Sequence, residues 1–426
     1  MIKNNSTLQA FVLTLFCVFL PTVSFALVIE EGVDQFRKSV SRILSSTCLR
    51  KNNYGVKIYS LDRGETLYEI RSKRLFIPAS NAKILTTAVA LKYLGANYRF
   101  ATRIYTDGIL ENETLKGNLY IKGSGDPKLV TEQLWLLVNE LRNLPIKKIE
   151  GNIIADNSFF DDQKRIKTWI KNPGAQAYEA PLGALSFNFN TIKVYVSPGQ
   201  KVGDRPEIVV EPENEYIKLE NSALTLRPRK RRRLIVNRVA KVDHDLITVA
   251  GGINLGRPRA QYFLNITDPT RYALSVFKSY IDLAGIKFDG QLQEGQIPNS
   301  ATQLYVHEGE PLALALRGLN KFSNNFVAEQ ILKTIGGEHL GLPGSTQKGL
   351  SVFKEYMEEL GYEPSQYSIY DGSGLSRQNR LSPAIIVDIL RNVKDDLSVY
   401  PEFVAALGVM GVDGNVKKRM RKVAKS

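Results

Sequence analysis

The sequence has few cysteines and histidines, and this scarcity excludes several kinds of site. Of its two cysteines, Cys17 lies in an apolar N-terminal segment and Cys48 is the only other one. If that segment is removed, an intrachain disulfide cannot form. His244, His307 and His339 lie far apart and lack metal-ligand spacing, so we expect neither a metal site nor a cofactor. Nothing in their spacing supports a Ser-His-Asp triad.

Long apolar runs are also absent. The most apolar stretch, Phe11 to Leu20, is too short to span a bilayer comfortably. It follows a short positively charged start and precedes Pro21 and the small residues of Ser24-Phe25-Ala26, an arrangement typical of an export signal. We therefore expect residues 1–26 to be a cleaved signal peptide. The remaining chain is too long for one hydrophobic core and predicts two or three domains.

Positive charge is plentiful but concentrated. The net charge is +14, and two runs, Arg227 to Arg233 and Lys417 to Lys425, carry six positive charges each. Such runs favour nucleic acid in a cytoplasmic protein. An exported chain without interleaved aromatic residues favours anionic lipid headgroups or envelope polymers instead, so we expect peripheral contact with an anionic membrane surface and no nucleic acid. The alternative is a solvated basic loop.

Apolar periodicity predicts a helical region interrupted by strands. A hairpin is expected over Tyr54 to Ile70 and a helix from about Ser80 to Leu94. Between Arg99 and Asp289 short strands prevail. We expect strands at 103–105, 119–122, 192–196, 208–210 and 247–250, and helices at 131–143, 272–284, 312–319, 324–335 and 349–360.

The spacing Ser-x-x-Lys is the main chemical signal. It occurs at Ser80/Lys83, Ser275/Lys278, Ser345/Lys348 and Ser351/Lys354. Only Ser80 follows a proline and opens an apolar helix, which directs Lys83 into a packed environment. Three residues along a helix rise about 4.5 Å and bring the hydroxyl and the amine side by side. We therefore predict that Ser80 is a nucleophile and Lys83 its base.

Burial is the physical reason for this prediction. A free lysine has a pKa near 10.4, and holding it neutral at pH 7 costs roughly 4–5 kcal/mol. Desolvation and a second nearby cation lower that pKa and leave an amine able to take the serine proton. The helix N-terminus beneath Ser80 would also stabilise a developing oxyanion.

A second polar segment, Asn320-Lys321-Phe322-Ser323-Asn324-Asn325, precedes another apolar helix. Ser323 could relay a proton to a leaving amine, and Asn325 could bind a substrate amide. The structural alternative is a helix N-cap at Ser323 or Asn324, and both interpretations can hold together. Ser-x-Asn recurs at Ser186-Phe187-Asn188, so the tripeptide alone is uninformative.

With these segments the chain resembles the serine D-alanyl-D-alanine carboxypeptidase/endopeptidases, the class C penicillin-binding proteins of peptidase family S13. Four stretches carry the resemblance in the order of the family. They are Pro78-Ala79-Ser80-Asn81-Ala82-Lys83, Gly123-Ser124-Gly125-Asp126-Pro127, Asn320-Lys321-Phe322-Ser323-Asn324-Asn325 and Asp371-Gly372-Ser373-Gly374-Leu375-Ser376. The resemblance implies Ser80 as nucleophile, Lys83 as base, and Ser323 and Asn325 as the second motif.

The resemblance also implies an α/β (α+β) penicillin-binding-protein or serine β-lactamase-like transpeptidase domain. Residues 27–98 and 290–426 would form it, and residues 99–289 would be a strand-rich insert of two subdomains, about 99–156 with 245–289, and 157–244. The implied protein is periplasmic, cleaves peptidoglycan peptides through an acyl-enzyme and binds β-lactam antibiotics.

One departure from the family pattern concerns a Lys-Thr-Gly motif, which the sequence does not contain. The family carries it on a strand after a segment like Ala406 to Val416, so we expect the C-terminal strands to be missing through a truncated reading frame and the activity to be impaired. Two other functions stay open: a non-catalytic homologue that binds peptidoglycan, and a serine β-lactamase or esterase on the same fold.

Overall fold

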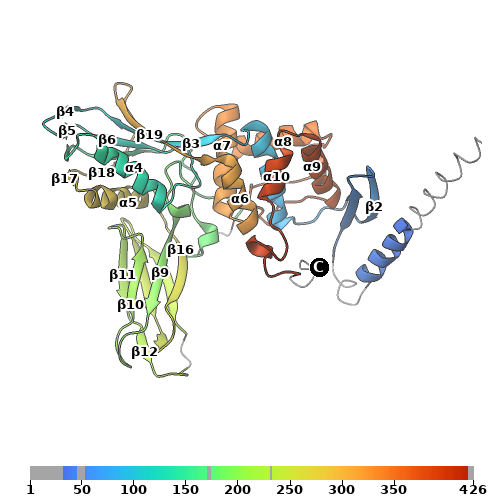
Figure 1. Cartoon of the computed structure of the whole chain (residues 1–426), viewed down its shortest axis with the longest axis horizontal. Coiled ribbons are helices and arrows are strands. Elements are labelled where there is room, and N and C mark those ends of the chain that lie inside the picture. Colours follow the sequence, from blue (N-terminus) through green and yellow to red (C-terminus); the bar gives the residue numbers. More distant parts are fainter. Residues whose placement is uncertain (1–31, 46–52, 170–173, 231–232, 421–426) are drawn as a thin grey trace, which may run out of the picture. The chain divides into compact units, whose positions relative to one another are not determined.

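The computed structural model describes residues 32–45, 53–169, 174–230 and 233–420 (Figure 1). The expected signal peptide, Cys48, Arg231, Arg232 and the end of the C-terminal basic run lie outside these residues. The chain divides into two compact units, residues 1–76 with 382–391, and residues 77–381 with 392–426. None of the described helices is long and apolar enough to span a membrane.

The smaller unit contains the expected hairpin. Strands β1 (Val56–Ser60) and β2 (Glu65–Ile70) pair antiparallel as a two-stranded sheet, with a register shift at Ile58/Tyr59. A helix over residues 32–44 sends the Arg37 guanidinium to the Leu67 carbonyl oxygen, 2.8 Å away. Helix α9 (Pro383–Asp395) begins in this unit, where the Arg391 guanidinium lies over the Tyr59 ring.

A five-stranded mixed sheet forms the first part of the larger unit, in the order β18-β8-β6-β3-β19. Its strands are β3 (Arg99–Thr106), β6 (Leu119–Lys122), β8 (Ile153–Asp156), β18 (Leu292–Glu294) and β19 (Thr302–Pro311). A four-stranded sheet follows from β4 (Ile109–Glu111), β5 (Thr114–Lys116), β7 (Lys148–Glu150) and β17 (Lys287–Phe288).

Two amphipathic helices, α4 (Thr131–Asn143) and α5 (Pro269–Leu283), pack against each other and contact strands of these two sheets (Figure 1). Each buries one apolar stripe, as a surface helix over a core should. Asp268 caps α5 by accepting the Thr270 and Arg271 amides. The core between the layers contains Ile104, Leu119, Leu134, Leu137, Ile153, Phe277 and Ile281.

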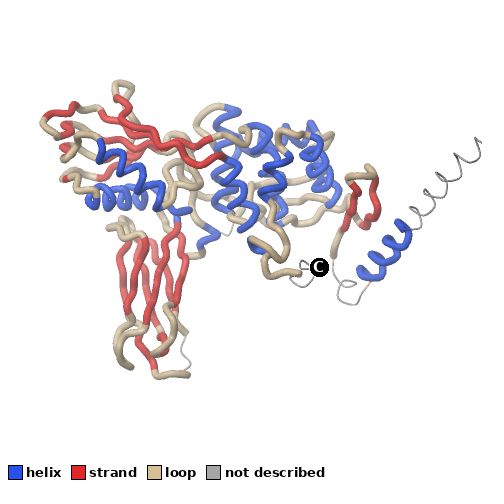
Figure 2. Tube along the Cα trace, in the orientation of Figure 1, coloured by secondary structure: helices blue, strands red, loops and turns tan. Residues whose placement is uncertain are grey.

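Small sheets make up the rest of the insert, drawn red in Figure 2. Strands β9 (Thr191–Ser197), β10 (Glu207–Glu211) and β16 (Ala260–Asn265) form one, and β11 (Ile217–Asn221), β13 (Ile235–Ala240) and β14 (Asp245–Ala250) form another. Strands β12 (Leu224–Leu226) and β15 (Gly252–Asn254) pair as a third.

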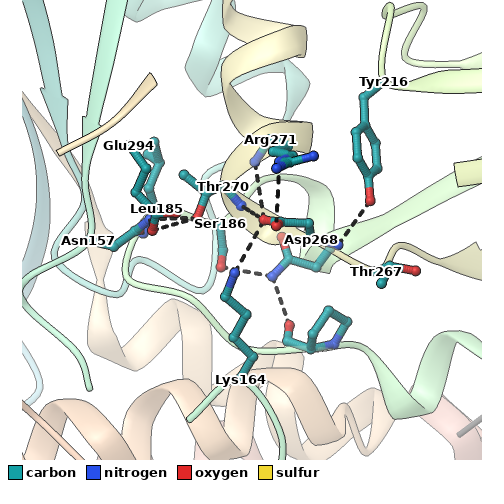
Figure 3. Close-up of polar contacts among 12 residues, drawn as sticks. Asn157, Lys164, Leu185, Ser186, Tyr216, Thr267, Asp268, Thr270, Arg271 and Glu294 are labelled. Carbon is teal, nitrogen blue, oxygen red and sulfur yellow. Dashed lines mark hydrogen bonds and ion pairs between the residues drawn. The ribbon is translucent and has the colours of Figure 1, made fainter. Parts of the chain in front are cut away.

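A polar network anchors the start of α5 to the loops beside it (Figure 3). The Lys164 ammonium lies 3.3 Å from the Asp268 carboxylate, and the Asp268 amide donates to the Tyr216 hydroxyl. The Asn157 side chain donates to Thr270 Oγ1 and accepts the Leu185 amide. These bonds satisfy polar groups that would otherwise be costly to bury, and they have a structural role.

Helices form the remainder of the larger unit, drawn blue in Figure 2. They are α3 (Ala82–Tyr93), α6 (Leu312–Phe322), α7 (Asn325–Leu340), α8 (Thr346–Glu359) and α10 (Tyr400–Ala406). Helix α3 contacts α6, α7 and α8. Helices α7 and α8 approach closely at Gly336 and Gly349, where an added Cβ on Gly336 would lie 2.4 Å from the Gly349 nitrogen.

The strand-rich insert between helical segments is therefore confirmed, and so are the expected hairpin, strands and helices, with ends shifted by a few residues. Strand β19 was not expected, because helices were expected from residue 303 onward. Its pairing with β3 carries the five-stranded sheet beyond residue 289. The exact domain boundaries remain a prediction.

Candidate active site

The nucleophile candidate Ser80 lies on a short turn rather than inside a helix. Residues Ala79–Asn81 form a single 3-10 turn, and α3 begins directly after it at Ala82. Ala79 has a φ of 48°, a conformation uncommon for a residue with a side chain. Ser80 is exposed, whereas Lys83 is 2% exposed. The packed environment predicted for Lys83 is therefore present, beside an accessible serine.

The other three predicted site residues, Lys83, Ser323 and Asn325, each lie within hydrogen-bonding distance of Ser80 or of one another. The Ser323 hydroxyl lies 2.8 Å from Ser80 Oγ. Lys83 Nζ lies 3.4 Å from Ser80 Oγ and 2.8 Å from Asn325 Oδ1. Ser80 comes from the turn before α3 and Lys83 from α3, whereas Ser323 and Asn325 come from the α6–α7 junction, more than 240 positions later in the chain. All four predicted site residues thus meet in one cluster.

The α6–α7 junction positions Ser323 and Asn325 through two helix ends. Ser323 terminates α6 in the left-handed conformation, with φ 57° and ψ 43°. Asn324 then caps α7, and its side chain accepts the Val327 amide at 3.2 Å. The expected helix cap is therefore confirmed at Asn324, which lies between the two residues that reach Ser80 and Lys83. The catalytic interpretation of Ser323 and Asn325 remains a prediction.

The segment Asp371-Gly372-Ser373-Gly374-Leu375-Ser376, which we call the 371–376 loop, packs against the cluster. The Ser373 carbonyl accepts a hydrogen bond from Lys83 Nζ at 2.6 Å, and the Gly372 carbonyl accepts one from Thr86 Oγ1 at 2.6 Å. Gly374 has a φ of 80°, and a Cβ there would lie 1.8 Å from the Ala79 carbonyl oxygen. The loop therefore contacts both the lysine and the turn that carries Ser80.

Burial sets the base strength of Lys83. Desolvation lowers its pKa to about 8, because an ammonium loses its hydration in the interior. The carboxylates of Glu329 and Asp371 act in the opposite direction and raise the pKa. The charged groups that act on Lys83 are therefore these two carboxylates, whereas the sequence predicted a second nearby cation. At pH 7 about a tenth of Lys83 is then neutral, far more than for a free lysine with its pKa near 10.4.

An exposed serine beside a buried lysine agrees with the family of proteins that this chain resembles. Residues 36–426 match the model of the D-Ala-D-Ala carboxypeptidase 3 (S13) family. The chain belongs to this family. It is 28% identical over 365 residues to a D-alanyl-D-alanine carboxypeptidase of Actinomadura sp. (strain R39), covering 84% of this chain and 67% of that protein.

A second S13 relative links sequence and structure. The D-alanyl-D-alanine carboxypeptidase DacB of Haemophilus influenzae is 25% identical over 408 residues, covering 93% of this chain and 82% of that protein. The crystal structure of that organism's penicillin-binding protein 4 superposes with a TM-score of 0.76 over 86% of this chain and 80% of its own. Another structure of the same protein is a complex with a β-lactam. The penicillin-binding-protein type of α+β fold is confirmed.

The other Ser-x-x-Lys pairs of this S13 chain have structural explanations. Ser275 is buried and its hydroxyl accepts the Glu215 and Tyr216 amides, and Lys278 forms ion pairs with Glu215 and Asp282. Ser345 caps α8 by accepting the Lys348 amide. Ser351 donates to the carbonyl of Gln347 on α8, and Lys354 pairs with Glu358. These contacts agree with the expectation that only Ser80/Lys83 is chemically special.

The Gly123–Pro127 stretch and the three histidines make contacts other than those of the Ser80 cluster. Ser124 of the Gly123–Pro127 stretch exchanges hydrogen bonds with the Ala101 amide and carbonyl, which is a structural role. His244 lies beside Asp243, His339 lies beside Glu355, and His307 is buried with a pKa lowered by desolvation. Among the described residues, no group of three or more His, Cys, Asp or Glu could hold a metal ion.

Sequence reasoning missed Glu329, whose charge acts on Lys83. Glu329, Asp371 and the Ser373 carbonyl lie around the lysine, yet only Asp371 and Ser373 fell in a segment noted beforehand. Glu329 follows Asn325 by four positions, and thus lies on the same face of α7. A glutamate within the apolar helix Phe326 to Ile335 was the available signal.

Proposed function

We propose that this chain is a serine-type D-Ala-D-Ala carboxypeptidase that acts on peptidoglycan peptides through an acyl-enzyme on Ser80. The observation that carries the proposal is the hydrogen-bonded group of Ser323, Ser80 and Lys83, with oxygen–oxygen and nitrogen–oxygen distances of 2.8 and 3.4 Å. An exposed serine beside a buried lysine of lowered pKa is a nucleophile with its own base.

The roles follow from position. Ser80 Oγ attacks the carbonyl carbon of the terminal peptide bond while its proton passes to Lys83 Nζ. The carbon–nitrogen bond then breaks, and the leaving amine takes a proton through the Ser323 hydroxyl. Asn325 holds Lys83 through its Oδ1, and its amide nitrogen donates to the Tyr178 carbonyl oxygen. Water afterwards attacks the ester, and the same groups return the proton to Ser80.

Covalent labelling tests the nucleophile. A fluorophosphonate reacts with an activated serine and a fluorescent penicillin mimics the peptide, so the pair separates serine activation from recognition of the peptide. We expect both adducts on Ser80 by mass spectrometry and none in Ser80→Ala. Ser351→Ala is the matched control, since Ser351 has the same spacing to a lysine on α8 and should leave labelling unchanged. A fluorophosphonate adduct that persists in Ser80→Ala contradicts the assignment.

The same assay separates the alternatives. A non-catalytic peptidoglycan-binding protein would bind D-Ala-D-Ala peptides without forming either adduct. A β-lactamase or esterase would form the penicillin adduct and hydrolyse it quickly. We propose that β-lactams instead remain on Ser80 as a long-lived ester while D-alanine is released from peptides. Measuring adduct lifetime and D-alanine release on one sample distinguishes the three.

Export to the periplasm is the second part of the proposal. It rests on the apolar stretch before Ser24-Phe25-Ala26 and on the peptidoglycan chemistry of the family. Mass spectrometry of the protein recovered from the periplasm should find an N-terminus at Leu27. An uncleaved chain retained in the cytoplasm would contradict this part.

We also propose that the end of the insert contacts an anionic membrane surface. The basic residues cluster there in space as well as in sequence: Arg227, Arg229, Lys230, Arg233, Arg257 and Arg259 are all exposed. Pairing of β12 with β15, and the close approach of Gly251 to the Arg233 carbonyl, bring these segments together. Val202, Leu224 and Ile235, between 38% and 54% exposed, add apolar groups at the same end. No nucleic-acid partner is proposed.

Vesicle binding tests this surface. Replacing Arg227, Arg229 and Lys230 with serine should weaken binding to phosphatidylglycerol vesicles on the order of 100-fold, from about 1 kcal/mol for each cation near the surface. Replacing the exposed cations Arg142, Lys147 and Lys287 is the control of equal charge. If the two triple variants lose binding equally, net charge alone acts and the surface is wrong.

A further inference from the structure

Glu329 is a fully buried carboxylate that our mechanism has not used. It lies on α7 with no exposed surface. Its Oε1 accepts the Ser373 amide at 2.8 Å and its Oε2 accepts the Gly372 amide at 3.1 Å. Burying a charged group is expensive unless hydrogen bonds compensate for lost hydration. A carboxylate kept at such a position therefore requires an explanation.

The position of its two partners supplies one. Glu329 accepts the amide of Ser373, the residue whose own carbonyl accepts the hydrogen bond from Lys83 Nζ. From the other side, the Asp371 carboxylate accepts the Gly374 and Ser376 amides. The 371–376 loop is therefore held by Glu329 of α7 and by the carboxylate of its own Asp371, and its Ser373 carbonyl accepts a hydrogen bond from the base.

We propose that Glu329 is a positioning residue that fixes Lys83 through the backbone of Gly372 and Ser373 and whose charge adjusts the base strength of that lysine. The proposal rests on the function assigned to Ser80 and Lys83 above. It assigns Glu329 no contact with substrate.

Electrostatics supports this role. Burial, together with the Asp371 carboxylate, raises the pKa of Glu329 to about 8, while burial lowers the pKa of Lys83 to about 8. The charged groups around this pair are Asp371 on the loop and Lys333, one turn further along α7, whose ammonium lies 2.6 Å from the Asp161 carboxylate. Glu329 therefore ionises in the same pH range in which Lys83 loses its proton. In that range its negative charge stabilises the Lys83 ammonium, so a variant without this charge should have a lower Lys83 pKa.

Two substitutions separate charge from position. Glu329→Gln keeps the size of the side chain and removes the charge, but its NH2 group replaces one of the two oxygens that accept the Gly372 and Ser373 amides. The titration midpoint of Lys83 should fall by about one pH unit. Glu329→Asp keeps the charge but shortens the side chain. It should leave the midpoint in place while slowing fluorophosphonate labelling of Ser80 on the order of tenfold. Glu338→Gln is the control, since Glu338 is an exposed glutamate on the same helix.

The Lys83 midpoint is read by pH-dependent amine labelling with mass spectrometry, which does not require Ser80 to react. A chain in which Ser80 fails to label therefore contradicts the proposed function but still reports on Glu329. An unchanged Lys83 midpoint in Glu329→Gln overturns the proposal. If that variant does not fold, Glu329→Asp decides, because a shifted midpoint in a variant that keeps the charge is equally incompatible with it.

Discussion

Lys83 Nζ donates to the carbonyl oxygen of Ser373 across 2.6 Å, although the two residues are 290 positions apart in the chain. This contact joins the first helix of the site to a loop that follows the insert and α8. It holds the amine while Asn325 Oδ1 holds it from a second direction, 2.8 Å away. Fixing a flexible lysine at two points reduces the entropy lost on reaching the geometry for proton transfer.

The identity of the base is open to direct substitution. Lys83→Arg keeps a positive charge, but a guanidinium does not lose its proton at neutral pH and cannot accept one from Ser80. We expect labelling by fluorophosphonate to slow about 10²–10⁴-fold in this variant and in Lys83→Ala. Lys354→Ala, in the exposed Ser351/Lys354 pair, should change nothing. If the Lys83→Arg variant is still labelled as quickly as the unchanged chain, another group must be the base.

The acylation rate should depend on pH through Lys83. Its pKa is lowered to about 8 in the folded chain, and only the neutral amine accepts a proton. The rate should therefore rise as pH increases through 8 and fall below it, in proportion to the neutral fraction. Fluorophosphonate labelling between about pH 5.5 and 9.5 measures this rise of the rate with pH. A rate independent of pH across 7 to 9 would be incompatible with Lys83 as base.

Substitutions at Ser323 and Asn324 should have different effects, the first on the reaction rate and the second on stability. Ser323→Ala removes the hydroxyl 2.8 Å from Ser80 Oγ but keeps the backbone, so we expect slower transfer and nearly unchanged stability. Asn324→Ala removes the cap of α7 and should lower the free energy of unfolding by about 1 kcal/mol. Thermal melts and labelling rates on both variants check this pair. Equal stability losses would mean that Ser323 also supports the helix end.

The sequence predicted the residues whose signal is local and missed those whose signal is spatial. Ser80 and Lys83 stand three apart on one turn, and Ser323 and Asn325 flank a recognisable cap, so short patterns indicate them. Glu329 acts on Lys83 only because the 371–376 loop folds between them, and no periodicity encodes that contact. Strand β19 was missed for the same reason, since its pairing with β3 joins residues about 200 positions apart.

Gly374 offers a test of whether the 371–376 loop positions the nucleophile. Its φ of 80° favours glycine, and a Cβ would lie 1.8 Å from the Ala79 carbonyl oxygen, so Gly374→Ala must displace either the loop or the Ser80 turn. Gly361 is the matched control, because it has a similar φ of 83° but nothing within 4 Å of an added Cβ. Gly361→Ala should lose about 1 kcal/mol of stability from the backbone conformation alone. Gly374→Ala should lose more, about 2–4 kcal/mol, and label Ser80 far more slowly. Denaturant unfolding and fluorophosphonate labelling measure both effects, and equal behaviour of the two variants would show that the contact between Gly374 and Ala79 does not position Ser80.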